Sequence, residues 1–82
     1  MPRINIAGNA VKKFTHGESA LDVEADTFGR LIHELDRRFP GLGRQVEESM
    51  AIAIDGEIYQ DAYHAPLKAE SEIWLIPKIA GG

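Results

Sequence analysis

The chain has 82 residues, of which 44% are hydrophobic and 27% charged, a length and composition that predict one domain and exclude a multidomain enzyme. Nine basic against 13 acidic side chains give a formal net charge of −4, and no stripe of Lys and Arg is present to neutralise phosphates, so nucleic acid is not an expected partner. The absence of cysteine excludes disulfides, thiolate metal sites and a cysteine nucleophile. Without a signal-peptide stretch or a long apolar run, we expect a cytoplasmic protein with no membrane partner.

The first predicted elements are two strands. Residues 3–7 alternate polar and apolar side chains and precede a Gly-Asn turn signal, which indicates a short strand. The alternation returns at residues 21–24. These two segments are therefore expected to form a hairpin across a connection that holds Lys12 and Lys13, with one apolar and one solvated face.

Apolar residues then recur at helical spacing, at Phe28, Leu31, Ile32, Leu35 and Phe39. The stripe predicts one main amphipathic helix. Its start is expected to be capped by Asp26 or Thr27, and its end is set by Pro40, because proline disfavours helical geometry in the residue before it. Gly29 in the first turn lowers helix propensity, so we expect a close approach to a neighbouring backbone there.

Beyond the helix, residues 43–49 are polar and are expected to hold one short helical turn. Residues 50–54 form the next predicted strand, in which apolar side chains alternate with small ones. Asp55-Gly56 is a strong hairpin signal, with residues 58–59 as the return strand.

The last predicted strand, residues 72–76, is apolar on both faces, which favours the middle of a sheet. The whole order predicts an α+β fold, a mixed sheet of about five strands with one main helix packed on one face. Because Ile73 and Leu75 point one way, Trp74 and Ile76 lie on the uncovered face unless a partner covers them. The alternative is that sheet neighbours simply half-bury Trp74.

No constellation of polar side chains predicts an active site within the domain. The histidines His16, His33 and His64 have no spacing that would place two ligands on one helix face, so we expect neither a metal nor a bound cofactor. The acidic residues are interpreted as solvated surface charge. Glu34 and Arg38, four apart on the helix, are expected to form a surface ion pair.

The informative segment is the end of the sequence. We predict a domain over residues 1–77 and a flexible tail over 78–82 that projects the terminal carboxylate up to about 17 Å. Gly81 and Gly82 have no Cβ, so the tail is expected to pass through a narrow channel in another protein. An α-carboxylate with a pKa of roughly 3.3 to 3.7 is an anion at neutral pH and a poor electrophile until ATP converts it to an acyl-adenylate.

A family resemblance rests on residues 65–82. This segment is similar to a run of a leucine, a turn, an apolar strand, a proline and Ala/Ser-Gly-Gly, and residues 54–57 are similar to the hairpin before it. Over nearly its whole length the chain resembles the sulfur-carrier proteins of the ThiS/MoaD family, which have the ubiquitin-like β-grasp fold.

The resemblance implies that Gly82 is adenylated with ATP by a ubiquitin-activating-type enzyme and converted to a thiocarboxylate. A sulfur-acceptor enzyme or a large synthase subunit then receives the sulfur, so the chain is a donor substrate and not a catalyst. The resemblance also implies partner contacts through the exposed sheet face and the tail, at Trp74, Ile76, Lys78, Ile79 and Ala80, with Gly81 needed for passage.

Molybdopterin synthesis, with this chain as the small synthase subunit, is the branch we expect. Two departures from the family pattern, Lys78 after Pro77 and Glu70-Ser71 in the turn, leave other branches open. These are thiazole synthesis, cysteine synthesis on a carrier, or conjugation of Gly82 to a lysine of a target, as in ubiquitin. The remaining alternative is a plain interaction domain whose terminal glycines are inert.

Overall fold

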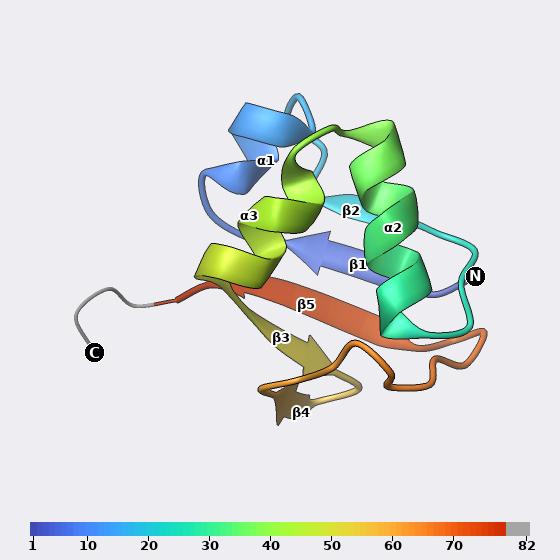
Figure 1. The fold of residues 1–82 in the computed structure, drawn as a ribbon. Helices are drawn as coiled ribbons and strands as arrows, with labels where there is room; N and C mark the ends of the chain where they lie inside the picture. The colour runs from blue at the N-terminus through green and yellow to red at the C-terminus, as the bar shows by residue number, and fades with distance from the viewer. Residues whose placement is uncertain (79–82) are drawn as a thin grey trace.

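The structure, a computed structural model, describes residues 1–78 apart from the side chains of Ala10 and Val11. Within this part the chain forms five strands and three helices, and Figure 1 shows the helices on one face of the sheet. In chain order the elements are β1 (Arg3–Ile6), α1 (Ala10–Phe14), β2 (Ala20–Asp22), α2 (Phe28–Arg38), α3 (Leu42–Ser49), β3 (Met50–Ile54), β4 (Glu57–Tyr59) and β5 (Glu72–Pro77). None of these helices has the length and apolar character that crossing a bilayer requires.

The strands form one mixed sheet in the order β2-β1-β5-β3-β4, so the expected central position of β5 is confirmed. β5 runs parallel to β1 and antiparallel to β3. Ile73 and Leu75 are fully buried beneath the helices, as the alternation predicts. Pro77, which follows the predicted strand of residues 72–76, still pairs with Met50 and is the last residue of β5.

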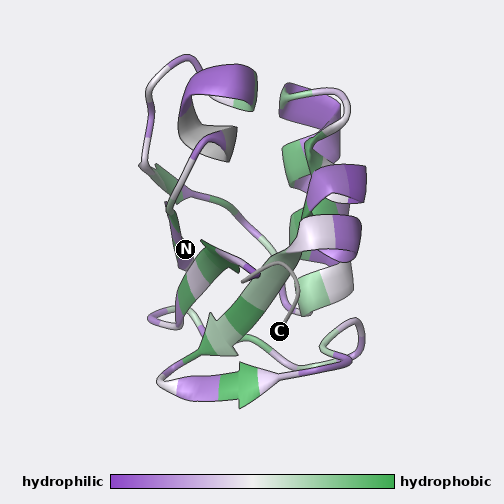
Figure 2. Ribbon diagram, turned by 90° about the vertical axis from the view of Figure 1, so that its left-hand side faces the viewer, coloured by the Kyte–Doolittle hydropathy of each residue, from purple (hydrophilic) through white to green (hydrophobic). Residues whose placement is uncertain are grey.

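The core lies between the sheet and the helices. Its fully buried large side chains come from every layer, namely Ile4, Val23, Leu31, Leu35, Leu42, Val46, Ile73 and Leu75. In Figure 2 the helices carry long hydrophilic stretches, in purple, whereas the central strands are largely green and pale. This arrangement confirms the α+β prediction.

Helix α2 begins and ends as the sequence predicts. The hydroxyl of Thr27 accepts a hydrogen bond from the backbone N–H of Arg30 at 3.2 Å, and the helix ends at Arg38. A Cβ placed on Gly29 would lie 2.9 Å from the Tyr63 ring and carbonyl oxygen, so the expected close approach is confirmed. The backbone N–H of Gly29 donates to that carbonyl at 2.8 Å, which fixes the loop after β4 to the helix.

The other two helices differ from the sequence prediction. The connection between β1 and β2 contains α1, and the segment expected to hold one turn is the eight-residue helix α3. Asp36 of α2 caps α3, because its carboxylate accepts the backbone N–H groups of Gly41 at 3.1 Å and Gly43 at 3.0 Å. Burial of Leu42 and Val46 then anchors α3 on the core.

Strand β2 is also shorter than the predicted residues 21–24. It covers Ala20–Asp22, and its register with β1 pairs Ile4 with Leu21. Val23 leaves the strand, donates its backbone N–H to Pro2 and is nevertheless fully buried. Core burial rather than strand pairing thus explains the apolar residue at this position.

The predicted pairing of Glu34 with Arg38 is wrong. Arg37 lies 2.7 Å from the Glu34 carboxylate, whereas the Arg38 guanidinium donates to the backbone oxygen of Asp22 at 3.4 Å. The hydrogen bond from Arg37 lowers the pKa of Glu34 below its ordinary value of 4.5. A carboxyl whose pKa is lowered on folding stabilises the native state above that ordinary value, and the contribution disappears as the pH falls through the lowered pKa.

Replacement of Arg37 by Gln is therefore expected to raise the pKa of Glu34 towards its ordinary value. A pH titration of the Glu34 side-chain carboxyl by NMR measures this change. The matched control is Arg44→Gln, which removes a surface arginine that instead pairs with Glu48 at 3.0 Å. An unchanged Glu34 titration in the Arg37 variant would contradict the pairing.

Candidate functional site

The sheet face away from the helices carries a row of apolar side chains. Strand pairing places Ile58, Ala53 and Trp74 opposite one another across β4, β3 and β5, and directly opposite residues share a face. Ala51 and Ile76 form the adjacent pair. We call these five residues the open face.

Exposure confirms that the open face is uncovered in this chain. Trp74 is 45% exposed, Ile76 43% and Ile58 78%. Their neighbours Ile73 and Leu75 on the same strand are fully buried, so the two faces differ as the alternation predicts. Sheet neighbours cover about half of Trp74, which leaves the remaining half available for a partner.

Ile58 belongs to the candidate site although sequence reasoning assigned it no role. Its face follows from the register of the hairpin, in which Asp55 and Gly56 have φ angles of 48° and 87°. Two positive φ angles characterise the two-residue turn that fixes this register and sets Ile58 opposite Ala53. The Asp-Gly signal in the sequence therefore suffices to place Ile58 on the open face, because it fixes which residues of β3 and β4 lie opposite one another.

Polar residues border the open face on the β1 side. Asn5 lies opposite Trp74 and donates a hydrogen bond to the Glu72 carboxylate at 3.3 Å, and Arg3 lies 3.4 Å from Asp22. An apolar centre with a charged border is the usual composition of a protein-binding surface.

The Asp55 side chain holds β5 in register with the hairpin. One of its carboxylate oxygens accepts the backbone N–H of Glu72 at 2.9 Å and the other accepts the Ser71 hydroxyl at 3.1 Å. The Ser71 oxygen in turn accepts the backbone N–H of Lys68 at 2.8 Å. These contacts link the loop before β5 to the turn between β3 and β4, and so position the strand that leads to the tail.

The end of the described part of the chain, at Pro77 and Lys78, is held by contacts with two other segments. The backbone N–H of Lys78 donates to the Ser49 carbonyl at 2.9 Å. On the other side, Gly8 has a φ of +85°, and a Cβ at this position would overlap the Pro77 ring. Lys78 itself is exposed, whereas Ile79, Ala80, Gly81 and Gly82 lie outside the described residues.

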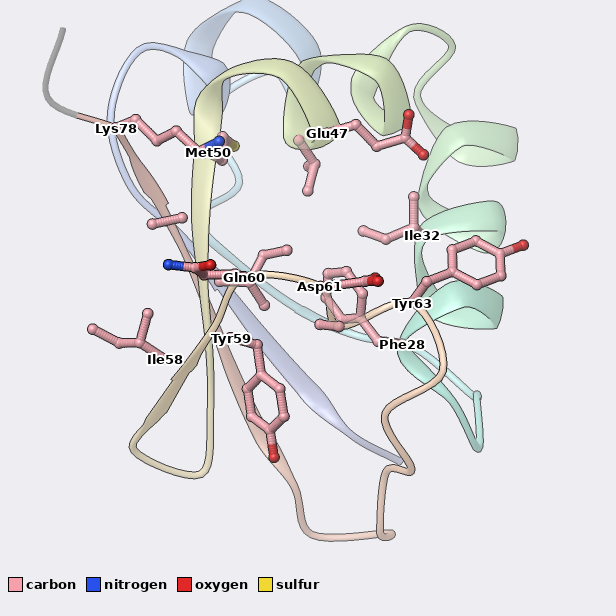
Figure 3. A pocket seen from close by; sticks show the side chains of 14 residues that line it. Phe28, Ile32, Glu47, Met50, Ile58, Tyr59, Gln60, Asp61, Tyr63 and Lys78 are labelled. Atoms are coloured by element: carbon pink, nitrogen blue, oxygen red, sulfur yellow. The ribbon is translucent and has the colours of Figure 1, made fainter. Parts of the chain in front are cut away.

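A depression, which we call the helix-side groove, lies on the helix side of the sheet. It has a volume of about 590 Å³ and lies between α2, α3, β3, β4 and the loop of residues 60–63. Its apolar floor consists of Phe28, Ile32, Val46, Met50, Ile52 and Ala62. Figure 3 shows the carboxylates of Glu47 and Asp61 on the α2 side of the groove and Lys78 near Met50. Sequence reasoning did not predict this groove.

The three histidines belong to different segments of the chain. His33 lies on α2, His16 has a φ of 56° in the loop after α1, and His64 meets the Tyr63 ring edge-on at 5.1 Å between centroids. Within residues 1–78, no three His, Cys, Asp or Glu side chains are grouped so as to hold a metal ion.

Solved structures of other proteins share the fold of this chain. A chain of the Amycolatopsis orientalis BexX/CysO complex superposes with a TM-score of 0.81 at 18% identity, with 100% of both chains covered. The small archaeal modifier protein 1 of Methanosarcina acetivorans gives 0.80 at 18% identity, over 99% of this chain and 95% of that one. A chain of the Helicobacter pylori molybdopterin-converting factor complex of subunits 1 and 2 gives 0.70 at 22% identity, over 99% and 97%.

The fold is therefore that of the ubiquitin-like β-grasp proteins. The sequence matches the ThiS family over residues 5–82, and the chain belongs to that family. The small carrier proteins of this family are generally not enzymes. No curated protein sequence gives a significant match to the chain.

Proposed function

We propose that this protein is a sulfur carrier whose working group is the α-carboxylate of Gly82. The observation that carries this proposal is the family match, which extends through Gly82. The position of β5 supports it, because the strand that leads to the tail is held in the centre of the sheet by β1 and β3. The division into a domain over 1–77 and a tail over 78–82 remains part of the proposal.

The chemistry proceeds in two steps. The Gly82 carboxylate attacks the α-phosphorus of ATP, and pyrophosphate leaves, which forms a mixed anhydride with AMP. Hydrosulfide or an equivalent sulfur donor then attacks the carbonyl carbon, AMP leaves with the bonding electrons, and a proton is released, which gives the thiocarboxylate. The adenylating partner binds the ATP, and this chain supplies only the acyl group, so we expect no bound cofactor. We place the reaction in the cytoplasm.

Protein partners are proposed to dock on the open face. Trp74, Ile76 and Ile58 offer exposed apolar surface at its centre, and association buries such surface with a gain of about 25 cal/mol per Å² before entropic costs. The partners are a ubiquitin-activating-type adenylating enzyme and a sulfur-acceptor enzyme or large synthase subunit. Lys78, Ile79 and Ala80 complete the contact as the tail enters the partner, and Gly81 passes its narrowest part.

Molybdopterin-type cofactor biosynthesis is the proposed destination of the sulfur. The likeness to the molybdopterin-converting factor chain supports it, and that chain is found in a complex of two subunits. The likeness to a chain of the BexX/CysO complex supports instead a carrier that serves a partner other than a molybdopterin synthase subunit. A stable complex with a large synthase subunit, isolated from the source cells, would decide for the molybdopterin branch.

Incubation of the protein with ATP, a ThiS-type activating enzyme and sulfide is expected to convert Gly82 to the thiocarboxylate. Intact-mass spectrometry detects the replacement of one oxygen by sulfur, and fragmentation locates it at the last residue. Omission of ATP is the control, since the carboxylate is then not activated. A product that carries sulfur elsewhere, or none with each activating enzyme tested, would contradict the proposal.

A second candidate function is that of a protein modifier, supported by the likeness to the small archaeal modifier protein. In this case a lysine amine rather than a sulfur nucleophile displaces AMP, and an isopeptide bond joins Gly82 to the target. Higher-mass conjugates that disappear when Gly82 is removed would establish this function, and thiocarboxylate without conjugates would exclude it under the conditions of the experiment.

A further inference from the structure

The helix-side groove is an apolar depression that meets the open face at Ala51 and Ile58, whereas Trp74 and Ile76 lie outside it. Its volume of about 590 Å³ falls within the range of about 300 to 1,000 Å³ that is usual for binding pockets. The floor residues Phe28, Val46 and Met50 are buried, and Ile52 lies partly exposed beside them. Trp74 and Ile76 of the open face do not line the groove, so an occupant of the groove leaves these two side chains uncovered.

The charges around the groove restrict what it binds. Glu47 of α3 and Asp61 of the loop after β4 are the acidic residues that line it, and Lys78 is the one basic lining residue in the described part of the chain. The ion pairs in that part involve neither carboxylate. Glu47 and Asp61 are exposed at the border of the groove, so an occupant with a basic group beside its apolar one gains an ion pair with them that a purely apolar occupant lacks. The occupant therefore carries a positive charge beside its apolar group.

The backbone next to the groove favours an extended occupant. β4 is an edge strand, and its residues Ile58 and Tyr59 line the groove. In an extended chain, side chains two residues apart point to the same side. A large apolar side chain at one position and an Arg or Lys two positions away thus enter the groove together, the first over Ile52 and the second towards Asp61 and Glu47.

We propose that the helix-side groove is a docking site for an extended segment of a partner protein that carries a large apolar residue and a basic residue two positions apart. Charge complementarity selects this occupant over a purely apolar segment or an acidic one. The basic residue lies at the Glu47 and Asp61 side, away from Lys78, which fixes the direction of the segment. The site does not depend on any chemistry at Gly82.

The experiment titrates the full ¹⁵N-labelled chain with the capped peptide acetyl-Ala-Leu-Ala-Arg-Ala-amide and follows the amide resonances by NMR. Shifts are expected at residues 46–52 and 58–63, with none centred on Trp74. A peptide of the same composition with Leu and Arg adjacent, and one with Glu in place of Arg, are expected to bind at least threefold more weakly.

Variants of the protein test the charge pairing directly. The double variant E47Q/D61N is expected to bind the first peptide roughly three- to tenfold more weakly, since it removes two exposed ion pairs that contribute about 0.2 to 1 kcal/mol each. The double variant E18Q/E70Q removes the same net charge from exposed positions outside the groove, and its affinity is expected to match that of the parent. Shifts centred on Trp74 and Ile76, equal affinities for the three peptides, unaltered binding by E47Q/D61N, or no shifts at all would each overturn the proposal.

Discussion

Removal of Gly82 is expected to abolish thiocarboxylate formation. The shortened chain still ends in a carboxylate, that of Gly81, so the chemical group is not lost. Its position is lost, because one extended residue spans about 3.3 to 3.6 Å and the carboxylate no longer reaches the α-phosphorus of ATP in the partner. A displacement of this size exceeds the misplacement of about 1 Å that costs a reaction a factor of about 100 in rate. Intact-mass spectrometry after incubation with the activating enzyme measures the product.

Two controls distinguish a misplaced terminal carboxylate from a misfolded chain in this experiment. Addition of one alanine after Gly82 displaces the carboxylate in the opposite direction and is expected to abolish the reaction equally. The buried hydrophobic core extends from Ile4 to Leu75, so both variants are expected to unfold at the same temperature as the parent. A shortened chain that forms thiocarboxylate at the parental rate would contradict the role of Gly82.

The strongest patterns in the sequence predicted the elements that build the site. The stripe from Phe28 to Phe39 has helical period over three turns and therefore predicts a helix. Residues 72–76 are apolar on both faces and therefore predict a strand in the middle of a sheet. The faces of Trp74 and Ile76 followed from alternation alone, and the structure confirms them. The predicted tail covers residues 78–82, of which 79–82 lie outside the described part, and it stays a prediction.

Features that depend on tertiary contacts were not predictable from local pattern. α3 requires the Asp36 carboxylate of another helix at its first turn, and its sequence has only Leu42 and Val46 to indicate a buried side. Whether Glu34 pairs with Arg37 or with Arg38 depends on side-chain rotamers and on the competing contact that Arg38 makes with the backbone oxygen of Asp22. The helix-side groove exists because α2 and α3 leave part of β3 and β4 uncovered, which is a property of packing and not of any segment.

Replacement of Leu75 by Ala and of Ile76 by Ala is expected to separate stability from partner binding. The two side chains are isomers on adjacent positions of β5, yet Leu75 is fully buried and Ile76 is 43% exposed. Loss of a buried leucine leaves a cavity that costs about 2 to 5 kcal/mol, a large part of the roughly 4 to 12 kcal/mol expected for a domain of this size. Ile76→Ala removes one cross-strand pair, which is worth at most about 1 kcal/mol.

Partner binding is expected to respond in the opposite order. Ile76→Ala removes a contact from the centre of the open face and is expected to weaken binding to the adenylating enzyme roughly tenfold, about 1.4 kcal/mol. Leu75→Ala, measured well below its unfolding midpoint, is expected to bind with nearly parental affinity, since its side chain faces the helices. Urea unfolding and isothermal titration calorimetry measure the two quantities on the same samples. If both variants lost stability equally, the assignment of the two faces of β5 would be wrong, and if Ile76→Ala bound as tightly as the parent, partners would dock on a surface other than the open face.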